Sequence, residues 1–91
     1  MEFKEEASQI VLINEEGNQI GEIIWETLAD GTMAINHTGV NSDYRGQNLA
    51  RKLLDAAVVK ARNEHKKISP VCPYVQKQFE KDDTFADVWA K

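Results

Sequence analysis

The chain has 91 residues, of which 42% are hydrophobic and 29% charged, and its net charge is −4. This composition is typical of a globular protein, and the single cysteine, Cys72, excludes a disulfide scaffold, so we expect one domain spanning residues 1–91. No window approaches the ~20 apolar residues of a membrane-spanning helix, and the acidic balance argues against nucleic acid. We therefore expect a cytoplasmic protein that binds neither a membrane nor nucleic acid.

Three β-branched, apolar runs predict an antiparallel meander in the first part of the chain. The runs are Gln9–Ile13, residues 19–28 and residues 32–40. Turn-forming residues at 15–18 and an Asp-Gly pair at 30–31 separate them, which is typical of hairpin connections.

The clearest periodic pattern follows a polar turn at residues 41–48 and predicts an amphipathic helix over residues 48–64. Its apolar residues recur at spacings of one, three and four: Leu49, Ala50, Leu53, Leu54, Ala57, Val58 and Ala61. We expect this apolar face to pack on the sheet. His65, at the end of the predicted helix, is a favourable partner for the helix dipole.

The last third of the chain predicts a strand over residues 68–75 and two short helical pieces over residues 76–91. Pro70 and Pro73 remove backbone donors from the strand, so we expect it to diverge from its neighbour. The helical pieces are separated at residues 82–84, where a new helix can be capped. The fold class is therefore α/β, or α+β in the stricter sense.

The segment from residue 41 to residue 67 carries seven basic and three acidic side chains in an otherwise acidic chain. A strand that runs through a glycine-containing turn into a helix aims free backbone N–H groups at one spot, which suits phosphate or pyrophosphate. Arg45, Arg51 and Lys52 add positive charge near the same helix end. The alternative is an ordinary helix start that binds nothing.

Residues 44–50 (YRGQNLA) resemble the pyrophosphate loop of the GNAT superfamily of acetyl-coenzyme A-dependent N-acetyltransferases, Arg/Gln-x-x-Gly-x-Gly/Ala. Arg45 occupies the first position and Ala50 the last. Asn48 replaces the central glycine, and asparagine tolerates glycine-like backbone angles better than other residues. The Cys-Pro-Tyr sequence at 72–74 is similar to that of the smallest single-domain members, and the resemblance extends over residues 35–75.

The resemblance implies a minimal GNAT-like fold in which acetyl-CoA lies between the splayed strands 32–40 and 68–75. It also implies N-acetyl transfer to an unidentified amine, on a small molecule or a protein. Larger members build the acceptor site from additional elements, so we expect an open or shared acceptor site here. The implied cofactor-binding residues are Thr38, Gly39, Val40, Tyr44, Arg45, Gly46, Gln47, Asn48, Leu49, Ala50 and Arg51.

Three side chains are candidates for catalysis, and no metal site is expected. The resemblance places Cys72 beside the thioester, where it can attack or steer the acetyl group, although an isolated cysteine in an apolar strand more often packs. His37 is a candidate general base, or a hydrogen-bonded structural residue as a lone histidine more often is, and we expect it on one strand face with Ile35 and Gly39. Tyr74 is a candidate proton donor to the leaving thiolate, or a half-buried packing residue.

These features leave three functions open. The first is an N-acetyltransferase, and the second is a non-catalytic module that binds or senses acyl-CoA. The third is a small interaction domain without a nucleotide.

Overall fold

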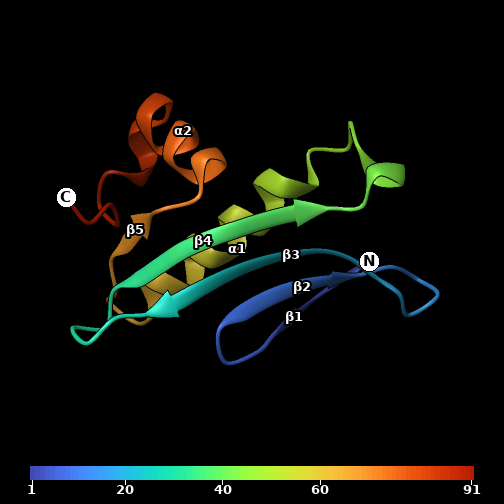
Figure 1. The fold of residues 1–91 in the computed structure, drawn as a ribbon, viewed down its shortest axis with the longest axis horizontal. Helices are drawn as coiled ribbons and strands as arrows, with labels where there is room; N and C mark the ends of the chain where they lie inside the picture. Colours follow the sequence, from blue (N-terminus) through green and yellow to red (C-terminus); the bar gives the residue numbers. More distant parts are fainter.

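The computed structural model describes residues 1–91 and contains one five-stranded mixed sheet in the order β1-β2-β3-β4-β5 (Figure 1). The strands are β1 (Glu2–Glu5), β2 (Gln9–Ile13), β3 (Gln19–Thr27), β4 (Met33–Val40) and β5 (Ile68–Pro70). The first four strands are antiparallel neighbours, and β5 is parallel to β4. The helices are α1 (Leu49–Asn63) and α2 (Pro73–Lys81), with short 3₁₀ turns η1 (Ser42–Tyr44) and η2 (Asp83–Phe85).

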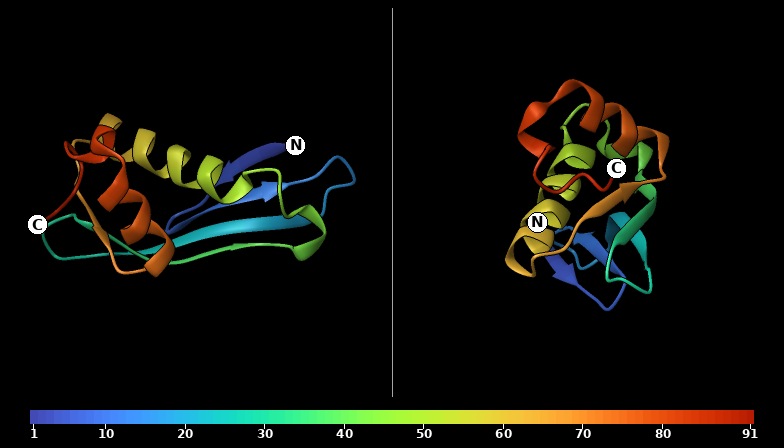
Figure 2. Two further views of the ribbon diagram at one scale, coloured as in Figure 1. Left: turned by 90° about the horizontal axis from the view of Figure 1, so that it is seen from above. Right: turned by 90° about the vertical axis from the view of Figure 1, so that its left-hand side faces the viewer.

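Helix α1 covers one face of the sheet, and α2 lies beyond β5 at the sheet edge (Figure 2). The apolar stripe predicted for α1 is confirmed, because Leu53, Leu54 and Val58 are buried against the strands. In α2 and η2, Phe79 and Phe85 stack with their ring centroids 5.0 Å apart. The opposite face of β2, β3 and β4 has no helix over it (Figures 1 and 2). Neither helix is long and apolar enough to cross a membrane.

The predicted meander is confirmed as β2, β3 and β4, but β1 was not predicted. All four residues of β1 are exposed. The segment is a strand because its backbone pairs with β2, with Phe3 opposite Leu12 and Lys4 opposite Val11. A strand held by backbone pairing at a sheet edge need not carry an alternating apolar pattern.

Strand β4 contains a bulge that reverses its side-chain alternation. Trp25 pairs with Ile35 and Ile24 with His37, which leaves Asn36 without a partner. Ile35 faces the buried core, whereas His37 is exposed on the face that α1 does not cover. The prediction that His37 shares a face with Ile35 is therefore wrong, because one inserted residue shifts the two-residue period of a strand.

The predicted strand 68–75 is shorter than expected, since β5 ends at Pro70 and Pro73 is the first residue of α2. Proline suits that position because the first helical N–H has no partner within the helix. The expected divergence is confirmed: pairing ends at Ile35–Pro70, and one further bond joins Cys72 N to Ile35 O at 2.8 Å. The predicted break in the C-terminal helical segment is confirmed at Asp82, which caps η2.

Candidate cofactor-binding site

Two left-handed residues shape the loop between β4 and α1. Gly46 has φ +83°, and Asn48, the residue before the first turn of α1, has φ 59° and ψ 30°. The sequence-based expectation that Asn48 adopts glycine-like angles is therefore confirmed. The Asn48 side chain makes no capping hydrogen bond, so its backbone conformation is the property that the loop uses.

Six consecutive backbone N–H groups, from Gly46 to Arg51, donate to no acceptor in the protein. The last three belong to the first turn of α1, where helical geometry provides no partner. The first three belong to the loop, which is exposed. The result is a row of free donors at the positive end of a fifteen-residue helix, an arrangement that favours an anion.

A pocket of about 220 Å³ lies beside this loop and extends to α2. Its lining residues are Val40, Tyr44, Arg45, Gly46, Asn48, Leu49, Ala50 and Tyr74. The structure thus brings Tyr74 next to the predicted loop. Burial raises the pKa of the Tyr74 phenol, so the hydroxyl remains protonated and available as a donor.

The side chain of Arg51 points into the interface between the helices. Its guanidinium lies 2.6 Å from Asp82 Oδ2, 3.1 Å from Asp55 Oδ1 and 3.2 Å from Gln78 Oε1. The hydrogen bond to Asp82 is the main reason that the Arg51 pKa is raised. The other two basic side chains predicted at the loop, Arg45 and Lys52, are exposed and pair with no carboxylate.

Cys72 lies at the point where β5 gives way to α2, and it is 7% exposed. Its Sγ is 3.8 Å from the Oγ1 of Thr38 on β4. The thiol therefore spans the gap between the diverging strands, on the β4 face opposite that of His37. Because the imidazole lies on the other face, it is not placed to activate the thiol.

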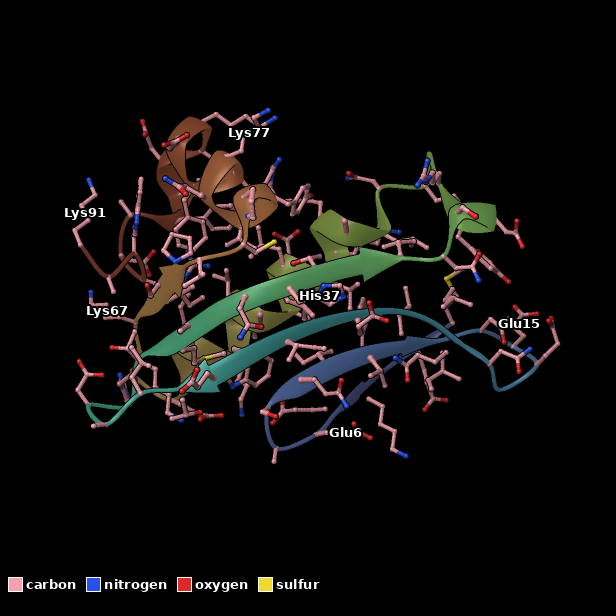
Figure 3. All side chains as sticks on the ribbon, in the orientation of Figure 1. Glu6, Glu15, His37, Lys67, Lys77 and Lys91 are labelled. Carbon is pink, nitrogen blue, oxygen red and sulfur yellow. The ribbon has the colours of Figure 1, made fainter.

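His37 has a partner that sequence reasoning missed. Its Nε2 lies 2.8 Å from Oε2 of Glu22 on β3. Figure 3 shows His37 between the ribbons of β4 and β3. A Cβ on Gly39 would collide with both groups, so glycine leaves the room that the pair occupies. No local motif marks Glu22, because the contact depends on the register between β3 and β4.

The family model described as GCN5-related N-acetyl-transferase matches residues 9–88 of the chain. The NMR solution structure of a GCN5-like protein from Staphylococcus aureus superimposes with a TM-score of 0.80 and 31% identity, over 98% of this chain and 87% of the other. No match was found among proteins of curated function.

Two larger solved structures share the fold at lower identity. A ribosomal-protein-alanine N-acetyltransferase from Brucella melitensis is 24% identical, with a TM-score of 0.61 over 80% of this chain and 59% of that protein. A GNAT family N-acetyltransferase from Escherichia coli, solved in complex with CoA, is 23% identical, with a TM-score of 0.60 over 66% of this chain and 37% of that protein. The chain thus spans less than two thirds of either. The predicted α+β fold is confirmed.

Proposed function

This chain belongs to the GCN5-related N-acetyltransferase family, and we propose that it binds acetyl-CoA and transfers the acetyl group to a primary amine. The observation that carries the proposal is the row of free backbone donors from Gly46 to Arg51. A row of six donors at a helix start matches the many acceptor oxygens of a pyrophosphate.

In this proposal the pyrophosphate lies against the loop, where Arg45 adds a charge-assisted contact at the rim. The pantetheine arm follows β4, whose edge beyond Ile35 has no strand partner. The backbone groups within Thr38, Gly39 and Val40 that point to that edge would pair with the amides of the arm, as a peptide strand pairs with a sheet edge. The arm then ends near Cys72, where the strands part.

The chemistry requires three events at the thioester. An unprotonated amine attacks the carbonyl carbon, the C–S bond breaks, and the leaving thiolate takes up a proton. Tyr74 is the candidate donor of that proton, because its phenol lines the pocket and its pKa is raised by burial. Cys72 is a candidate either to steer the acetyl group or to accept it transiently.

Calorimetric titration with acetyl-CoA tests the proposal, and S-acetylpantetheine, which lacks the pyrophosphate and nucleotide, is the matched control. Acetyl-CoA should bind, and the control should bind far more weakly because it leaves the donors of the loop unused. Absence of acetyl-CoA binding contradicts the proposal. Binding without thiol release in the presence of alkylamines, polyamines and peptide amines would instead identify a non-catalytic acyl-CoA-binding module.

A further inference from the structure

Three polar side chains form a hydrogen-bonded chain on the sheet face that no helix covers. Gln19 Nε2 donates to Glu22 Oε1 at 3.3 Å, and Glu22 Oε2 lies 2.8 Å from His37 Nε2. His37 Nδ1 has no partner in the protein, and the side chain is 52% exposed. One ring nitrogen is therefore held by a carboxylate while the other is open to solvent.

Two features of β4 place the imidazole there. The bulge at Asn36 turns His37 out of the core and onto the open face, opposite Ile24. Gly39 lacks the Cβ that would collide with the Glu22 carboxylate and the His37 ring. Bulges that re-aim a side chain occur frequently beside active sites.

The imidazole also lies on the part of β4 that borders the opening, where the proposed function places the thioester. Pairing between β4 and β5 ends at Ile35, so His37 is two residues into the part of β4 that borders the opening. Its chain neighbour, Thr38, contacts the Cys72 thiol from the other face. An acetyl group in the opening is therefore reachable by an amine that approaches from the open face.

We propose that His37 is the general base of acetyl transfer, that Glu22 and Gln19 are its positioning residues, and that the acceptor is a cationic amine bound on the open face of β3 and β4. This inference rests on the proposed function. The Glu22 carboxylate accepts the Nε2–H bond, which leaves Nδ1 as the unprotonated nitrogen that takes a proton.

The proton balance closes without a further reactant. An alkylammonium ion transfers one proton to His37 Nδ1, and the neutral nitrogen attacks the thioester carbonyl. As the C–N bond forms and the C–S bond breaks, the second nitrogen proton goes to the thiolate, directly or through a neighbouring acid. The products are an amide, CoA thiol and a proton that the imidazole returns to water.

The charge on this face favours an acceptor amine that carries no carboxylate of its own. The ionisable groups that strand alternation and register place on the face with His37 are Glu22 and Glu26 on β3 and the opposite charges of Glu2 and Lys4 on β1. The two carboxylates of β3 lie nearer to His37 along the sheet than the β1 pair does, since β1 is two strands further from β4 than β3 is. A carboxylate on the acceptor would be repelled, whereas a second ammonium group would be attracted.

The kinetic test uses thiol release from acetyl-CoA with 1,4-diaminobutane as acceptor and 4-aminobutyrate as the matched acidic probe. The diamine should have the higher kcat/KM. His37→Gln should lower kcat by the ~10²–10⁴-fold that a general base contributes, and Glu22→Gln by at least about tenfold. Glu80→Gln is the matched control, since it removes one exposed carboxylate from α2, which lies at the sheet edge and not on the face with His37, and its kcat should match the wild type.

A second measurement tests the positioning role without turnover. Nitrogen-15 NMR of the imidazole, recorded above the pH at which the ring titrates, should show the proton of His37 on Nε2 in the wild type. Glu22→Gln can donate as well as accept, so a tautomer mixture is expected there. A wild-type proton on Nδ1, or the same tautomer in both proteins, would overturn the proposal.

The outcomes separate this inference from the function on which it rests. If acetyl-CoA fails to bind, the proposed function fails. If acetyl-CoA binds and His37→Gln transfers at the wild-type rate, only the role of His37 fails. Binding with no transfer to either probe contradicts the transferase function itself, and with it the role of His37 as a base.

Discussion

Asn48 occupies a backbone conformation that costs a residue with a Cβ roughly 1–2 kcal/mol, and asparagine is one of the residues other than glycine that adopt it most readily. Because its side chain makes no capping bond, we predict that Asn48→Gly retains acetyl-CoA affinity or improves it. Asn48→Ala should lower both stability and affinity, because alanine disfavours positive φ. Urea unfolding and calorimetry on both variants measure the two effects.

Weaker binding by Asn48→Gly, with stability unchanged, would contradict this prediction. It would mean that the asparagine side chain itself contacts the cofactor and that glycine-like angles are only part of its contribution.

Cys72→Ser should leave acetyl-CoA affinity close to that of the wild type, since serine is nearly isosteric and the thiol is not part of the loop. A stability loss of about 1–3 kcal/mol is expected if the hydroxyl is left unsatisfied, although Thr38 Oγ1 lies within reach as a partner. Calorimetry and thermal unfolding measure these effects.

Intact mass after incubation with acetyl-CoA then decides the chemical role of the thiol. A lasting acetyl adduct on the wild type but not on Cys72→Ser would show a two-step reaction through the cysteine. Loss of acetyl-CoA binding in the variant would contradict the expectation that the loop and β4, and not the thiol, provide most of the affinity.

At the scale of elements, Arg51 and Asp82 join the first turn of α1 to the end of α2. The pKa of Asp82 is lowered from 3.8 to about 2, chiefly by hydrogen bonds from the Thr84 hydroxyl and amide and then by Arg51. A carboxyl whose folded pKa is depressed stabilises the fold above its ordinary pKa, and this contribution is lost as the pH falls from about 4 to about 2.

Asp82→Asn should therefore unfold at a lower urea concentration than the wild type at pH 7. The difference between the two proteins should shrink as the pH falls through that acid range, because the wild-type carboxyl is then protonated. Urea midpoints recorded across the range measure this. A difference that stays constant with pH would show that the loss comes from packing and not from charge.

Local sequence predicted most of the elements for identifiable reasons. The spacing of Leu49, Leu53 and Leu54 predicts one buried helix face, and the β-branched runs predict β2, β3 and β4. Strand β1 and the shortened β5 were not predicted, because one depends on backbone pairing and the other on Pro73 beginning a helix.

The candidate site also has parts that the sequence predicts and parts that it does not. The loop around Gly46 and Asn48 was predictable because backbone angles restrict residue type locally. The partners of Arg51 and His37 were not predictable, because Asp82 and Glu22 reach them only through tertiary packing and strand register. The bulge at Asn36 decides on which sheet face His37 lies. The pattern of apolar and polar residues along the strand did not predict it.

At the scale of the whole molecule, acetyl-CoA should stabilise the fold by mass action. A ligand that binds only the folded state contributes about 2.7 kcal/mol at one hundred times its Kd. For a domain of this size, that corresponds to a rise in Tm of roughly 10–20 °C. Differential scanning fluorimetry measures it, with S-acetylpantetheine at the same concentration as the control. An unchanged Tm at millimolar acetyl-CoA contradicts the cofactor assignment.

The six free donors of the loop belong to the main chain, and this affects how the loop can diverge through evolution. A substitution at Gln47 or Ala50 alters a side chain but removes no donor; only proline removes one. The site is therefore robust to mutation wherever the two left-handed residues, Gly46 and Asn48, persist. In related chains, the side chains around the loop can therefore change in charge and size while the backbone still binds the same anion. The backbone angles of the loop identify such a site better than its side chains do.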